Sequence, residues 1–142
     1  MAKSYVLDTS AVFTYTKDED GSDAVEEILA LAKRGRQKVY LSFVSFMELY
    51  YITWQEKGEE TAKELMVLIE SLPVERVDSN PRITLSAGRI KANHKLSVAD
   101  AFIGATAVEK EAILVHKDPE LEALSQYFQT RKLPYSPSRR FP

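Results

Sequence analysis

Four acidic residues stand at the ends of predicted strands or at the starts of predicted helices. Asp8 ends the apolar segment 4–8, and Asp118 closely follows the segment 112–116. Glu48 and Asp100 fall in the first turns of helices expected from residues 45 and 98. Clustered carboxylates bind hard divalent cations, and such cations activate water for attack on a phosphodiester. We therefore predict that all four are metal-binding and catalytic residues.

The absence of cysteine narrows the possible chemistry. No Cys occurs among the 142 residues, and there are only two His. Zinc–thiolate sites, disulfides and cysteine nucleophiles are therefore excluded, and a histidine-rich metal site is disfavoured. Any metal site must consist of oxygen ligands, which favours Mg²⁺ or Mn²⁺. We expect one or two such ions.

Length and hydropathy predict one domain that does not enter a membrane. A chain of 142 residues suffices for a single core, so we expect one domain spanning 1–142, with a loose tail from about residue 134. It has no apolar run of the roughly 18 residues that a membrane span needs. The N-terminal residues lack the pattern of a signal peptide, so we expect a cytoplasmic location.

Overall charge argues mildly against a nucleic-acid ligand. The formal net charge is −2, whereas nucleic-acid-binding domains usually carry a basic surface. Metal ions and a few basic residues would have to supply the positive field locally. The segment 33–38 holds four basic residues, which we interpret mainly as solvated surface, with contact to RNA phosphates as the alternative.

Strand-like and helix-like segments alternate along the chain. We expect strands at 4–8, 38–43, 74–77 and 112–116, with a short edge strand at 133–135. Helices are expected at 10–15, 22–34, 45–57, 59–72, 81–94, 98–110 and 119–127. Such alternation predicts an α/β sandwich around a mostly parallel sheet.

The predicted fold would bring the acidic residues together. Ligands of open parallel sheets bind at the carboxyl ends of the strands. Asp8, Glu48 and Asp118 directly follow strands, whereas Asp100 is placed there only by inference from the fold. Each residue also has a simpler interpretation as part of a helix cap or capping box. The two interpretations are compatible, because a helix N-terminus stabilises an ionised carboxylate.

Four segments carry a family resemblance. They read Tyr-Val-Leu-Asp-Thr-Ser-Ala-Val at 5–12, Ser-Phe-Met-Glu-Leu at 45–49, Leu-Ser-Val-Ala-Asp-Ala-Phe-Ile-Gly-Ala-Thr-Ala at 96–107 and Ala-Ile-Leu-Val-His-Lys-Asp at 112–118. In order and spacing they resemble the acidic motifs of PIN-domain ribonucleases and, within these, of the VapC toxins of toxin–antitoxin pairs. The resemblance covers nearly the whole chain.

This resemblance implies a fold, an activity and partners. The fold would be a three-layer α/β/α sandwich, and the activity Mg²⁺-dependent endonucleolytic cleavage of RNA. The partners would be the RNA substrate, a VapB-type antitoxin and a second copy of the chain in a homodimer. More large apolar residues crowd the helix at 45–57 than one helix face can bury, and some are expected at the antitoxin groove or the dimer contact: Phe46, Met47, Tyr50, Tyr51 and Trp54.

The fourth motif departs from the family pattern. His116 stands two residues before Asp118, where the family usually has threonine or serine. A single histidine at a strand end is usually structural, and we expect that role here. Glu120 is the candidate for the second acidic residue that often follows the fourth aspartate.

Two other functional classes share features with this sequence. A phosphotransfer enzyme, phosphatase or receiver domain also has an aspartate after its first strand. Ser10 occupies the position of a phosphatase's second aspartate, and no acidic pair precedes Asp8 as in a receiver. The second alternative is a catalytically silent PIN-like interaction module, which four intact carboxylates disfavour. The identity of the cleaved RNA is left open.

Overall fold

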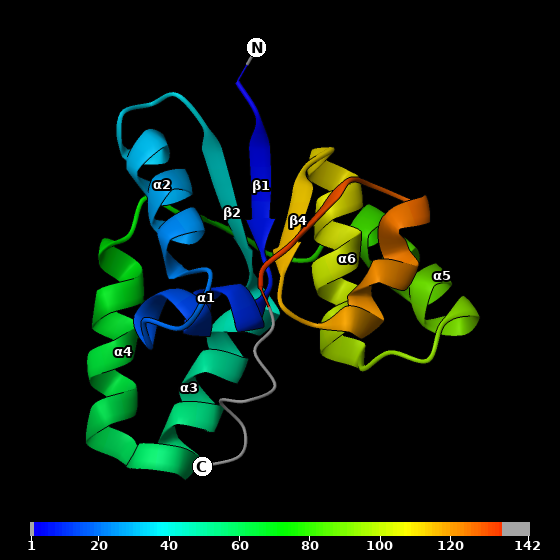
Figure 1. The fold of residues 1–142 in the computed structure, drawn as a ribbon. Helices are drawn as coiled ribbons and strands as arrows, with labels where there is room; N and C mark the ends of the chain where they lie inside the picture. Colours follow the sequence, from blue (N-terminus) through cyan, green and yellow to red (C-terminus); the bar gives the residue numbers. More distant parts are fainter. Residues whose placement is uncertain (1, 135–142) are drawn as a thin grey trace.

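A five-stranded parallel sheet runs through the centre of the computed structural model, which describes residues 2–134 (Figure 1). The strand order is β3-β2-β1-β4-β5, and every neighbouring pair is parallel. The strands are β1 (Ser4–Leu7), β2 (Lys38–Ser42), β3 (Glu75–Val77), β4 (Ile113–His116) and β5 (Thr130–Lys132). The predicted α/β class with a mostly parallel sheet is confirmed.

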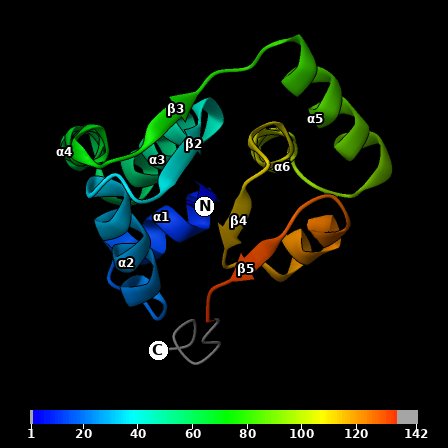
Figure 2. The ribbon, with the colours of Figure 1, turned by 90° about the horizontal axis from the view of Figure 1, so that it is seen from above.

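Helices cover both faces of this sheet. They are α1 (Thr9–Thr16), α2 (Ser22–Lys33), α3 (Phe43–Lys57), α4 (Glu59–Ser71), α5 (Pro81–Asn93), α6 (Val98–Lys110) and the 3₁₀ helix η1 (Pro119–Gln126). Viewed from above, α1 to α4 lie on one side of the sheet, and α5, α6 and η1 on the other (Figure 2). The described residues therefore form the three-layer α/β/α sandwich that the family resemblance implied.

Alternation along the strands produces two apolar cores. Val6 and Leu114 pack in the core shared with α5, α6 and η1. Leu7 and Val115, their neighbours along the chain, pack in the opposite core with α1 to α4. Because successive strand side chains point to opposite faces, a strand covered on both sides must be apolar throughout. This requirement explains the continuous apolar runs at β1 and β4.

Two elements differ from the sequence prediction by more than one residue at a boundary. Helix α3 begins at Phe43, because the buried Ser42 is its N-cap and its hydroxyl accepts a hydrogen bond from the Val44 N–H (3.3 Å). The predicted cap at Ser45 is therefore wrong. The edge strand lies at Thr130–Lys132 rather than at 133–135.

The edge strand was missed because its sequence is polar. Thr130 is half-buried, and the other two residues of β5 are exposed, so β5 lacks the apolar pattern of the central strands. The following residue, Leu133, is buried. The apolar signal therefore lies just beyond the strand, within the predicted range 133–135. Tyr135 and the predicted loose tail lie outside the described residues.

The strand order has a switch point between β1 and β4. From β1 the chain builds outward through β2 and β3, and it then crosses to β4 on the other side of β1. In open parallel sheets the crevice at such a point, beyond the carboxyl ends of the strands, is where ligands bind. Asp8 directly follows β1, and its N–H donates to the Val115 carbonyl of β4 (2.9 Å). Within the described residues, no helix is long and apolar enough to cross a membrane.

Candidate active site

Asp8 is a buried carboxylate with one oxygen bound and the other without a partner. Its side chain caps α1: Oδ2 accepts hydrogen bonds from the Ser10 N–H (3.1 Å) and the Ser10 hydroxyl (2.5 Å). Oδ1 is buried and has no hydrogen-bond partner. A buried polar atom without a partner is costly, so an unpaired oxygen at a switch point indicates a ligand.

Ser10 connects this carboxylate to the neighbouring strand end. While its hydroxyl donates to Asp8, the hydroxyl oxygen accepts a hydrogen bond from the Lys117 N–H (3.0 Å), just beyond β4. This one side chain therefore bonds to groups on both sides of the switch point. It holds the Asp8 carboxylate through Oδ2 and leaves Oδ1 without a hydrogen-bond partner.

Glu48 is held by a hydroxyl of the first helix. The Thr9 hydroxyl lies 2.7 Å from Glu48 Oε1 and 3.0 Å from the Ser45 hydroxyl. Thr9 has one hydroxyl proton, and the charged acceptor at the shorter distance takes it, so the Ser45 hydroxyl donates to Thr9. Sequence reasoning missed this chain because Ser45 was interpreted as a cap. Its spacing of three residues from Glu48 on one helix is the signal that was available.

Asp100 comes to the site from the opposite layer. It lies in the first turn of α6, and its N–H donates to the hydroxyl of the N-cap Ser97 (3.1 Å). Asp118 is the N-cap of η1, where its Oδ1 accepts a hydrogen bond from the Glu120 N–H (3.0 Å). Asp8 and Asp118 thus act as helix N-caps themselves. Asp100 lies inside the first turn of α6, whose N-cap is Ser97.

The carboxylates lie close enough to perturb one another. Burial raises the pKa of Asp8 to about 7, the Ser10 hydrogen bonds oppose this, and repulsion from Asp100 and Glu48 adds to it. Burial likewise raises the pKa of Asp100 to about 6, with repulsion from Glu48, Asp118 and Glu120 adding to the rise. The four predicted residues and Glu120 therefore share one region of negative potential. The Asp100 carboxylate repels each of the other four.

The donor groups of this region are of the kind that a divalent cation binds. Among residues 2–134, no three acidic or histidine side chains already stand in a geometry that would hold a metal ion. The donors nevertheless fit one, because Oδ1 of Asp8 is buried and unpaired and its neighbours are carboxylates that repel it. A cation would convert this repulsion into attraction and would shift the group to its ionised form.

The predicted basic segment lies far from these carboxylates. Residues 33–38 connect the end of α2 to the start of β2, at the amino edge of the sheet (Figure 1). The acidic residues occupy the carboxyl edge. This placement favours solvated surface over contact with a substrate at the site. Lys117 is nearer, but its Nζ lies 3.4 Å from Glu19 Oε1.

Comparisons with known proteins agree with the geometry. The family model of the PIN domain matches residues 5–126. No curated protein matches the sequence significantly. The fold is similar to a chain of VapBC2 from Rickettsia felis bound to a DNA fragment from their promoter, at 20% identity and a TM-score of 0.74, covering 92% of this chain and 99% of that chain. It is also similar to a chain of DNA-bound VapBC from Salmonella typhimurium, at 19% identity and a TM-score of 0.73, with coverage of 93% and 98%.

A further similar structure has a stated activity. Mycobacterium tuberculosis VapC20, a sarcin–ricin loop cleaving toxin, has a TM-score of 0.65 at 15% identity, covering 84% of this chain and 93% of that chain. At such low identity these structures establish likeness of fold.

The raised pKa values predict how the stability of the metal-free protein depends on pH. Folded Asp8 keeps its proton up to about pH 7, whereas the unfolded chain loses it near 3.8. The contribution of protonated Asp8 to folding stability is therefore fully present below about pH 4. As the pH rises to about 7 it is lost, by up to about 1.4 kcal/mol per pH unit. In EDTA, the free energy of unfolding measured with urea should fall from pH 5 to pH 8.

Substitution of Asp8 should reduce this fall. In Asp8→Asn the decrease in unfolding free energy between pH 5 and pH 8 should be clearly smaller than in wild type, because asparagine retains the cap without the titration. Asp23→Asn, which alters an exposed aspartate in the first turn of α2, should behave as wild type. An equal decrease in unfolding free energy between pH 5 and pH 8 for Asp8→Asn and wild type would contradict the burial of this charge.

Proposed function

Because the chain belongs to the PIN domain family, we propose that it is a Mg²⁺- or Mn²⁺-dependent endoribonuclease and the toxin of a cytoplasmic toxin–antitoxin pair. Its substrate is single-stranded RNA. The catalytic and metal-binding residues are Asp8, Glu48, Asp100 and Asp118. The observation that carries the proposal is the buried, unpaired Oδ1 of Asp8 amid carboxylates that raise the Asp8 pKa.

The carboxylates divide between two tasks. Asp8 and Asp100 are the principal metal ligands, since they are the two whose pKa the surroundings raise. Glu48 and Asp118 support a second ion or orient the attacking water. A bound Mg²⁺ or Mn²⁺ supplies the acidity that turns water into a nucleophile and neutralises charge that develops on the phosphodiester.

Hydrogen bonds within the site hold three of the four carboxylates by one oxygen and leave the other oxygen for this purpose. Ser10 engages Oδ2 of Asp8, Thr9 engages Oε1 of Glu48, and the N–H of Glu120 engages Oδ1 of Asp118. Among the described residues, no hydrogen bond involves the second oxygen of these three. The chain's own contribution is therefore to fix these three carboxylates by one oxygen each, so that their other oxygens are oriented before an ion arrives.

The histidines do not supply an alternative acid–base pair. His116 is completely buried, and Nε2 of His94 lies 2.9 Å from the hydroxyl of Tyr127. A metal-independent ribonuclease would use the 2′-hydroxyl as nucleophile and would leave a cyclic phosphate. Water activated at the carboxylates should instead leave a 5′-phosphate and a 3′-hydroxyl.

An antitoxin of the VapB type is the partner that we propose for α3 and α4. Met47, Tyr51 and Trp54 are 55%, 42% and 44% exposed on α3. Val67 and Leu68 are exposed on α4, which packs against α3. Met47, Tyr51 and Trp54 are spaced three or four residues apart and so share one face of α3. Exposed apolar residues grouped in this way mark protein interaction sites. The similar structures include VapBC complexes.

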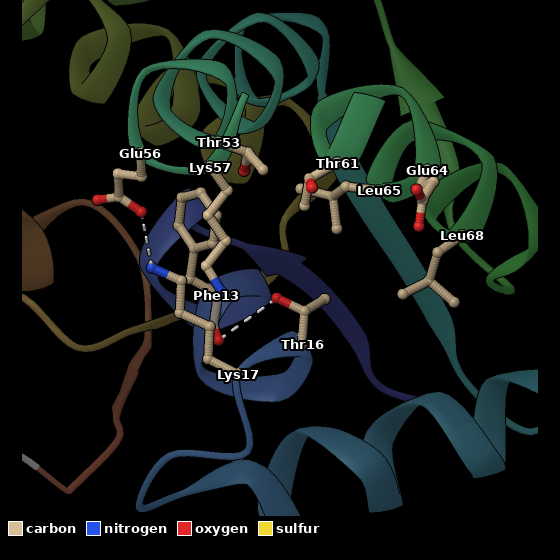
Figure 3. A pocket seen from close by; sticks show the side chains of 10 residues that line it. All are labelled: Phe13, Thr16, Lys17, Thr53, Glu56, Lys57, Thr61, Glu64, Leu65 and Leu68. Carbon is tan, nitrogen blue, oxygen red and sulfur yellow. Dashed lines mark hydrogen bonds and ion pairs between the residues drawn. The ribbon is translucent and has the colours of Figure 1, made fainter. Parts of the chain in front are cut away.

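A cavity next to this surface suits an inserted side chain. It measures about 320 Å³ between α1, α3 and α4, with Phe13, Leu65 and Leu68 among its lining residues (Figure 3). Lys17 and Glu56 form an ion pair across it (3.3 Å). An apolar side chain of the antitoxin would be buried there, next to the ion pair.

The opposite layer offers a surface for the proposed homodimer. Leu85 of α5 and Val98 of α6 are 76% and 60% exposed. A second, apolar cavity of about 200 Å³ lies between these helices, with Val98 and Phe102 in its lining. A second copy seated on this layer would leave the surface of α3 and α4 accessible to the antitoxin.

Cleavage of a single-stranded RNA oligonucleotide tests the catalytic proposal. Asp100→Asn should lower kcat/KM at least about 100-fold, since even outer partners of a metal site contribute about 10- to 100-fold. Asp23→Asn, also in the first turn of a helix, should retain wild-type activity. Asp118→Asn should reduce cleavage without unfolding the protein, because asparagine also caps a helix.

The chemistry of the products provides the decisive outcome. EDTA should abolish cleavage, and Mg²⁺ or Mn²⁺ in excess should restore it. Cleavage that persists in EDTA, or products that end in a 2′,3′-cyclic phosphate, would contradict the mechanism. A folded wild type that cleaves no RNA under any metal condition would favour the silent interaction module.

Co-purification from the native operon tests the partner. The chain should recover a small protein and should be toxic when it is expressed alone. Trp54→Ala should weaken the complex about 10-fold or more, as is typical of an aromatic anchor. Leu85→Ala, an exposed apolar residue of the other layer, should not. Recovery of no small partner by a non-toxic chain would contradict the toxin proposal, and unchanged binding by Trp54→Ala would exclude the surface on α3.

A further inference from the structure

We infer that His116 is a positioning residue: its ring fixes the backbone at Asp118 and thereby directs that carboxylate toward Asp100. The inference rests on the proposed function of Asp118 as a site carboxylate. His116 is the last residue of β4 and is completely buried. Its Nδ1 faces the N-cap of η1, and its Nε2 faces a side chain within η1.

One ring nitrogen determines the tautomer. The backbone N–H of Asp118 donates to Nδ1 of His116 (3.1 Å). A peptide N–H can only donate, so Nδ1 must carry a lone pair, and the proton of the neutral ring is on Nε2. Nε2 lies 3.0 Å from Oε1 of Glu122 in η1 and therefore donates to it. Both nitrogens are used internally, so the ring does not contact substrate.

The acceptor of the ring is itself held in place. The Thr130 hydroxyl lies 3.2 Å and 3.1 Å from the two carboxylate oxygens of Glu122. Thr130 begins β5, whereas Glu122 belongs to η1. His116 thus joins three consecutive elements through one hydrogen-bonded chain. With Glu122 fixed from two sides, the ring has one orientation and one tautomer.

This chain controls the direction of the fourth carboxylate. Asp118 is the extended N-cap of η1 (φ −107°, ψ 115°), and its side chain accepts from the Glu120 N–H. The ring fixes the peptide plane that precedes the Cα of Asp118. The hydrogen bond from the Glu120 N–H fixes the Asp118 side chain. A threonine or serine at position 116 would offer a hydroxyl to the same i+2 N–H. The imidazole makes this contact from a completely buried position.

Measurements on wild type test the geometry without reference to activity. ¹⁵N-labelled histidine in the whole chain should show, by NMR, a proton bonded to Nε2 of His116 and none on Nδ1. The amide of Asp118 should exchange slowly with solvent. A proton on Nδ1, or a rapidly exchanging Asp118 amide, would overturn the inference whether or not the chain cleaves RNA.

Two substitutions separate positioning from packing. His116→Asn keeps an acceptor near the place of Nδ1 and should retain most of kcat. His116→Leu fills similar volume without an acceptor and should lower kcat about 10-fold or more, as outer partners of metal sites do, with an unchanged KM for RNA. Equal kcat for folded His116→Leu and wild type would overturn the inference. If His116→Leu does not fold, His116→Asn and the NMR measurements decide. A wild type that shows the expected ring and amide signals but no cleavage would refute the proposed function alone.

Discussion

The carboxylate of Asp8 lies in a place where its charge is costly, and the rest of the site is arranged around that cost. It is buried at the switch point of a parallel sheet, one oxygen has no hydrogen-bond partner, and two neighbouring carboxylates repel it. A fold selected for stability alone would place an apolar or hydrogen-bonded side chain there. A divalent cation would resolve the conflict, because it would supply the missing partner and remove the repulsion.

The sheet topology explains how residues distant in sequence reach this point. Helices α1, α3 and η1 start close after strands β1, β2 and β4, so their N-termini lie at the carboxyl edge of the sheet. Each N-terminus carries partial positive charge, which favours the ionised carboxylates. The positive charge at these helix N-termini partly offsets the repulsion among the crowded carboxylates. Capping and the proposed metal binding would therefore use the same residues. One oxygen of Asp8 and of Asp118 caps its helix, and the other would be left for an ion.

Much of this arrangement follows from the sequence because its causes are local. Ser97 and the apolar run after it predict α6 at the bounds it has in the structure. The caps formed by Asp8 and Asp118 are local and follow from the sequence. The Thr9 partner of Glu48 does not, because the two residues meet across 39 residues of chain. Strand β5 was misplaced because an edge strand needs little apolar character. The bonds of His116 to Glu122 depend on the turn that η1 makes after Asp118.

Membership of the PIN domain family separates the nuclease from the phosphotransfer alternative, but the central claim is that the carboxylates form a metal site. Calorimetric titration of Mg²⁺ or Mn²⁺ into the metal-free protein and into Asp8→Asn tests it most directly. Wild type should bind one or two ions per chain saturably, and Asp8→Asn should lose most of this affinity. Equal affinity of the two proteins, with both folded, would contradict it.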